Sequence, residues 1–79
     1  MKNFFLKLFG NIKIDNDLLK TAEEYDRKGI ENGKLENYNE AIVNFSKALN
    51  ICPNYASAYM NRGVAYFHLK DYNNALNDL

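Results

Sequence analysis

Apolar residues recur along most of the chain at spacings of three and four, which is the period of an amphipathic helix. From Asp17 the pattern continues to about Leu35 and predicts a first helix there. A second stripe consists of Ala41, Ile42, Phe45, Ala48, Leu49 and Cys52. A third consists of Ala58, Tyr59, Val64, Ala65, Tyr66, Phe67 and Leu69, and a fourth helix is expected from Tyr72 to the last residue, Leu79. The pattern predicts an all-α fold.

Polar residues stand where these helices are expected to begin. Asn37 is placed to cap the second helix, with Glu40 three residues later in the reciprocal position of a capping box. Pro53 is expected to end that helix. Asn54 and Asp71 are expected to cap the third and fourth helices.

Residues 22–45 recur at residues 56–79 with an offset of 34 positions. The identical pairs are Ala22/Ala56, Tyr25/Tyr59, Gly29/Gly63, Leu35/Leu69, Tyr38/Tyr72, Asn39/Asn73 and Ala41/Ala75. A repeat of this length is typical of solenoid proteins. We therefore expect stacked copies of one antiparallel helix-turn-helix unit.

Gly29 and Gly63 occupy equivalent positions inside the first helix of each unit. A glycine in a helix costs about 1 kcal/mol relative to alanine, so a close approach of two helices is the expected compensation. Ala41 and Ala75 are the expected partners on the second helix. Aromatic side chains are expected to fill the wider gaps beside each crossing: Tyr25, Phe45 and Tyr59.

At these positions the chain resembles the tetratricopeptide repeat family. The first copy is carried by Tyr25, Gly29, Leu35, Tyr38, Ala41, Phe45, Ala48 and Pro53, and the next by Tyr59, Gly63, Tyr66, Leu69, Tyr72 and Ala75. Lys28 and Arg62 stand where leucine is usual, and Asn32 replaces the aromatic residue that Tyr66 keeps. The resemblance implies a fragment of an α-solenoid, with one complete unit at 17–53 and a second at 54–79 that is truncated in its second helix.

The first sixteen residues, 1–16, differ in kind. Lysines edge an aromatic and aliphatic face formed by Phe4, Phe5, Leu8, Phe9 and Ile12. We expect a short amphipathic helix that covers the first repeat as a cap. A weak membrane-surface anchor is the alternative, and a signal peptide is disfavoured because Lys7 interrupts an apolar run that is already short.

The composition of the chain limits which classes of molecule it is expected to bind. Ten basic and ten acidic residues give no net charge, so nucleic acid is not an expected partner. One cysteine and one histidine are too few for a disulfide or a zinc site, and no cofactor or metal is expected. We read Cys52 as a buried apolar residue, His68 as a helix-terminal base, and the acidic residues of the first unit, Asp26 among them, as a solvated face. A cytoplasmic location is expected.

No catalytic motif is present in the sequence, so we expect a non-enzymatic protein. In the family that the chain resembles, the first helices of successive repeats line a concave groove that binds a peptide or helix of a partner protein. The corresponding positions here are Glu23, Asp26, Arg27, Ile30, Lys34, Ser57, Met60, Asn61, Val64, Phe67 and His68. This lining suggests a partner segment with apolar anchors and basic residues.

Other roles stay open at this point. Some relatives clamp a chaperone's C-terminal carboxylate, and Asn61 resembles one clamp position, but Asp26 and Ile30 stand where that clamp has lysine and asparagine. The alternatives are a membrane-associated adaptor anchored by the N-terminal helix, and the N-terminal regulatory part of a longer enzyme with such repeats. Self-association through the uncapped C-terminal face is a further possibility.

Overall fold

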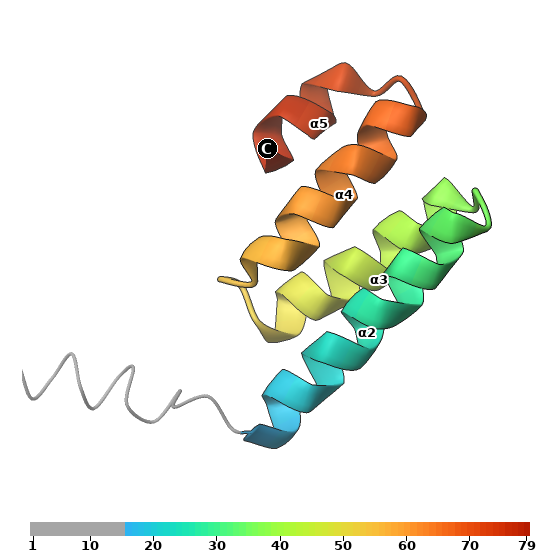
Figure 1. Cartoon of the computed structure of the whole chain (residues 1–79). Coiled ribbons are helices and arrows are strands. Elements are labelled where there is room, and N and C mark those ends of the chain that lie inside the picture. Colours follow the sequence, from blue (N-terminus) through green and yellow to red (C-terminus); the bar gives the residue numbers. More distant parts are fainter. Residues whose placement is uncertain (1–15) are drawn as a thin grey trace, which may run out of the picture.

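The computed structural model describes residues 16–79, and within that range it consists of helices joined by short turns. They are α2 (Asn16–Lys34), α3 (Tyr38–Ile51), α4 (Ala56–His68) and α5 (Tyr72–Asp78). Successive helices run antiparallel, and α2 and α4, the first helices of the two units, point the same way (Figure 1). The all-α prediction is confirmed. The predicted N-terminal amphipathic helix lies almost entirely outside the described residues.

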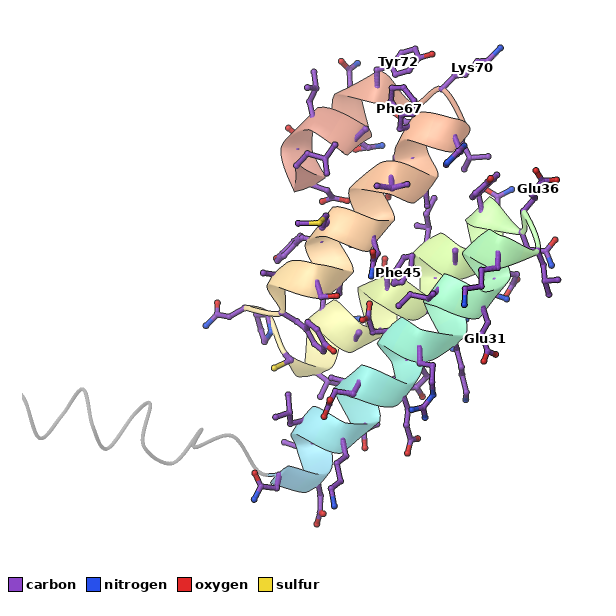
Figure 2. All side chains as sticks on the ribbon, in the orientation of Figure 1. Glu31, Glu36, Phe45, Phe67, Lys70 and Tyr72 are labelled. Carbon is purple, nitrogen blue, oxygen red and sulfur yellow. The ribbon has the colours of Figure 1, made fainter. Side chains whose placement is uncertain are left out.

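The turns after α2 and α4 repeat each other in backbone conformation. Glu36 and Lys70 both adopt a left-handed conformation with φ 62°, although neither is a glycine, and Figure 2 shows each at its turn. Each turn is closed by a main-chain hydrogen bond to a carbonyl at the end of the preceding helix: Asn37 N–H to Asn32 at 2.8 Å, and Asp71 N–H to Tyr66 at 2.9 Å. This is the bonding of a Schellman motif, and it ends the first helix of both units in the same way.

The predicted caps had different outcomes. Asp71 caps α5, since its carboxylate accepts from the Asn74 N–H at 3.4 Å and from Asn74 Nδ2 at 2.8 Å. Asn37 precedes α3 in the same way, but its side chain makes no capping bond, so the predicted capping box is wrong. The equivalent of Asn74 is Glu40, whose acidic side chain cannot donate a hydrogen bond back to the cap as the Asn74 amide does.

Helix α4 begins one residue later than predicted. Tyr55, not Asn54, is its N-cap residue, and it makes no side-chain capping bond. Pro53 and Asn54 instead form the turn after α3, closed by a bond from the Tyr55 N–H to the Cys52 carbonyl at 3.0 Å. Proline and asparagine both favour turn conformations, which explains why Asn54 is used in the turn.

Small side chains dominate the buried interior. The buried apolar residues are Ala22, Ala41, Phe45, Ala48, Leu49, Ala58, Ala65 and Ala75. One cluster forms where the two units meet, and Tyr25 and Tyr59 pack against it. A second cluster surrounds Phe45, which is labelled in Figure 2. Many of the large apolar side chains remain at the surface, Ile30, Met60 and Val64 among them.

The close approach predicted at the two glycines is present, and the nearest atoms belong to larger side chains than alanine. A Cβ on Gly29 would collide with the ring of Phe45, and one on Gly63 would lie 2.8 Å from Leu79 Cγ. Phe45 and Leu79 are themselves equivalent under the repeat. In each unit a large side chain one turn beyond Ala41 or Ala75 thus fills the space beside the glycine.

Candidate functional site

A cavity of about 250 Å³ opens where α2, α3 and α4 meet. It is lined by Gly29, Ile30, Gly33, Lys34, Tyr38, Ala41, Phe45, Asn61, Val64, Ala65 and His68. The structure therefore brings together Ile30 and Lys34 from α2 with Asn61, Val64 and His68 from α4, all of which belong to the groove set expected from the sequence. The backbone turns described above place these helices side by side.

The walls of the cavity are mainly apolar. Ile30 and Val64 face it from the two first helices and are both exposed, Val64 to 45%. Phe45, Ala41 and Ala65 are buried and close it from within the core. An apolar side chain of another molecule would therefore find apolar partners here, while water gains little from occupying the same space.

Aromatic rings gather near one end of the cavity, where Tyr38 and His68 line it and Phe67 and Tyr72 pack outside it. Tyr38 stacks on His68 with ring centroids 4.5 Å apart and planes 4° from parallel. Phe67 packs edge-on against His68 at 6.3 Å and against Tyr72 at 5.6 Å, and Figure 2 shows Phe67 beside Tyr72 at the turn between α4 and α5. We did not predict Tyr38 in the groove because it lies on the second helix of its unit, although its repetition as Tyr72 was a signal.

A polar cluster joins α2 to α4 beside the cavity. Asp26 is only 5% exposed, and its carboxylate accepts hydrogen bonds from Ser57 Oγ at 3.2 Å and Asn61 Nδ2 at 3.3 Å. The assignment of Asp26 to a solvated face is therefore wrong, because two side chains of the next unit bind its carboxylate in place of water. Burial, together with the charges of Asp26 and Glu23, raises the pKa of the nearby Tyr55 phenol above its usual value.

The remaining predicted groove residues lie away from this cavity. Glu23 and Arg27 are exposed on α2, and Phe67 is exposed near the end of α4. Met60 lines a separate hollow of about 580 Å³ between α4 and α5, together with Tyr59 and Leu79. Whether these four residues contact a partner stays a prediction.

An ion pair fixes α5 against α4. Arg62 Nε lies 2.7 Å from Asp78 Oδ2, its second nitrogen lies 2.8 Å from Oδ1, and its third donates to Ser46 Oγ at 3.1 Å. The bond to Asp78 raises the pKa of the guanidinium further above its ordinary value. From the sequence, Arg62 is a basic residue where leucine is usual, and nothing in the repeat indicates that Asp78 is its partner.

Residues 16–79 contain no cluster of three metal-ligating side chains. None of the helices in the same range is long and apolar enough to cross a membrane.

Comparisons with known proteins agree with the repeat pattern. Residues 34–70 match the TPR repeat family. The chain is 36% identical over 64 residues to DnaJ homolog subfamily C member 7 of Mus musculus, and 34% identical over 67 residues to Tetratricopeptide repeat protein 36 of Xenopus tropicalis. It is also 36% identical over 55 residues to Protein SGT1 homolog of Oryza sativa subsp. japonica.

These matches cover 81%, 85% and 70% of the chain but only 13%, 33% and 15% of the respective relatives. The search of solved structures found no match. Tetratricopeptide repeats are in general non-enzymatic modules for binding other proteins. With its repeat period, its paired helices and these relatives, the chain belongs to the tetratricopeptide repeat family.

Proposed function

We propose that this chain is a non-enzymatic interaction module that binds a peptide segment of a partner protein in the groove between α2 and α4. The observation that carries the proposal is the cavity between Ile30 and Val64, which is apolar, open and continuous across the junction of two units. Its volume of about 250 Å³ is below the roughly 300–1,000 Å³ of pockets that enclose a drug-sized ligand. It suits one apolar side chain of a longer segment that lies along the groove.

The groove favours a different partner from the one expected from the sequence. Basic residues were expected in the partner because Glu23 and Asp26 line the predicted groove. Asp26 is now engaged with Ser57 and Asn61 inside the protein, and the charged residue that lines the cavity is Lys34. The proposed segment therefore carries an apolar anchor, and a basic residue next to that anchor is disfavoured.

A selection from a displayed library of random peptides against the 79-residue chain tests this proposal. Selected peptides should share an apolar position, and Val64→Glu should weaken their binding because it puts a charge on the apolar wall. If the anchor is a hot spot worth 2 kcal/mol or more, the loss is about thirtyfold or greater.

Leu76→Glu on α5 is the matched control, since Leu76 is an apolar residue that is 74% exposed and lies outside the cavity. This variant should bind the selected peptides as the unaltered chain does. Equal binding by the Val64→Glu variant, with its helicity intact, would place the binding surface elsewhere and contradict the proposal.

A further inference from the structure

Asn61 lies on the α4 wall of the cavity, and both hydrogens of its side-chain amide are used inside the protein. Nδ2 donates to Asp26 Oδ1 at 3.3 Å and to Ser57 Oγ at 3.3 Å. An amide nitrogen has two hydrogens to donate and cannot accept a hydrogen bond. These two bonds therefore use up its donor capacity, and Asn61 has no N–H left to offer a ligand.

The buried carboxylate of Asp26 decides which way the amide faces. If the amide of Asn61 were turned over, its oxygen would face the oxygens of Asp26 with no hydrogen between them. Asp26 is nearly inaccessible to water, so an unfavourable contact of this kind would not be relieved by solvent. Asp26 thus acts as a positioning residue that holds the Asn61 oxygen away from itself.

The Asn61 oxygen is the part of this side chain that remains for a ligand. No group of residues 16–79 donates a hydrogen bond to it. Every buried side-chain oxygen in that range has a partner, and Asn61 is half-buried. Its Oδ1 atom is therefore accessible to solvent and able to accept a hydrogen bond, on a residue that lines the cavity.

The groups around Asn61 disfavour two of the three kinds of ligand group. A carboxylate beside Asn61 would meet the acceptor Oδ1, on an amide that is already bonded to the carboxylate of Asp26, although Lys34 on the other wall would attract it. An ammonium or guanidinium group would meet Lys34 on the opposite wall, and no acidic residue lines the cavity. An uncharged N–H group satisfies the Asn61 oxygen without either repulsion, and the main chain of a peptide supplies one next to every side chain except proline.

We propose that Asn61 Oδ1 accepts a hydrogen bond from a main-chain N–H of the bound peptide, beside the apolar side chain that enters the cavity. The inference rests on the proposed function and specifies the group that the groove recognises. It makes Asn61 an acceptor, in contrast to an asparagine that donates its amide hydrogens to a terminal carboxylate.

The orientation of Asn61 is measured first on the free chain. In nuclear magnetic resonance spectra, both side-chain amide protons of Asn61 should exchange slowly with water and show small temperature coefficients, because both are hydrogen-bonded. The side-chain amide of Asn50, which is exposed, provides the reference. If the Asn61 protons behave as those of Asn50 do, the amide is free to turn and the inference is wrong.

Small probes then test recognition. N-acetyl-leucine methylamide has two main-chain N–H donors, the same molecule methylated on both nitrogens has none, and N-acetyl-leucine ends in a carboxylate. Titration of the full chain, followed through the amide signals of Val64 and Asn61, should show the methylamide binding about three- to tenfold more tightly than the doubly methylated probe. Salt sufficient to screen Lys34 keeps its charge from dominating the comparison.

The Asn61→Leu variant removes the acceptor and keeps a similar side-chain size. It should bind the methylamide and the doubly methylated probe equally, whereas a purely steric effect of methylation would persist in it. Equal binding of these two probes by the unaltered chain, or tightest binding of N-acetyl-leucine, would overturn the inference and leave the proposed groove intact. If no probe shifts the Val64 signal, the proposed function fails, and the inference fails with it.

Discussion

Replacing Gly29 by alanine should destabilise the protein, although alanine is the better helix former. The added Cβ would clash with the ring of Phe45, with Cδ1 at 2.6 Å and Cζ at 2.8 Å from it, whereas carbon atoms normally approach to about 3.5–4.0 Å. Phe45 is only 3% exposed, so a displacement of its ring would disturb the side chains that pack around it. Overpacking of this kind costs about 1–3 kcal/mol.

Gly33→Ala is the matched control, because Gly33 lies one turn further along α2 and a Cβ there would have no neighbour within 4 Å. This variant should gain about 0.5–1 kcal/mol from helix propensity alone. Gly29→Ala should gain a similar amount and lose about 1–3 kcal/mol to the clash. The two variants should therefore differ by about 1–3 kcal/mol, which is the steric cost alone.

Urea denaturation followed by circular dichroism measures this difference, and an unchanged slope confirms that the midpoints report stability. In a domain of this size, 1 kcal/mol corresponds to a change of about 4–8 °C in the melting temperature. The clash should also shrink when Phe45→Leu is added to Gly29→Ala, as a double-mutant cycle would show. If Gly29→Ala is as stable as Gly33→Ala, Phe45 does not require a glycine opposite it.

Two further predictions concern the turns and the ion pair. Glu36→Gly should raise the free energy of unfolding by about 0.5–1 kcal/mol, because the left-handed conformation strains any residue with a Cβ and glycine avoids that strain at some entropic cost. The control, Glu31→Gly inside α2, should instead lower the free energy of unfolding by about 1 kcal/mol in the same urea experiment. A loss of stability in both variants would argue against a strained turn. Arg62→Met should lower the free energy of unfolding by about 2–4 kcal/mol, because it leaves the poorly exposed Asp78 carboxylate without its partner. Lys28→Met, at the equivalent position in the first unit, should lower it by less than about 1 kcal/mol, which is the worth of the Lys28 contact with the Tyr25 ring. Equal losses of stability in the two variants would mean that the ion pair contributes nothing specific.

Helices and repeat units could be predicted from the sequence because both depend on short spacings within it. The apolar stripes placed each described helix within a residue or two, and the repeat placed Glu36 and Lys70 at equivalent turns. Side-chain capping was less predictable. Asn37 and Asp71 have similar backbone angles, yet only Asp71 uses its side chain, since its carboxylate has the Asn74 amide as a second donor.

The contacts that define the candidate site could not be predicted in the same way. Asp26 bonds to Ser57 and Asn61 across 31 and 35 positions of sequence, and the stack of Tyr38 on His68 also joins different units. Such contacts depend on how two units pack, which neither the apolar period nor the repeat specifies. Asp26 was therefore wrongly interpreted as a solvated residue, because its buried partners lie in the next unit.

The two units use the same backbone design with different side chains at the helix crossing. In the first, the buried ring of Phe45 fills the notch at Gly29, and Asn44 donates to Asn32 at 2.7 Å. In the second, Leu79 takes the place of Phe45 but is 67% exposed, so Arg62 and Asp78 supply the specific contact between α4 and α5. Because glycines and left-handed turns hold the helices in place in both units, the side chains that face the groove are free to suit a partner. Asn61 illustrates this freedom, since the orientation of its amide depends on Asp26 and not on any residue that the repeat requires.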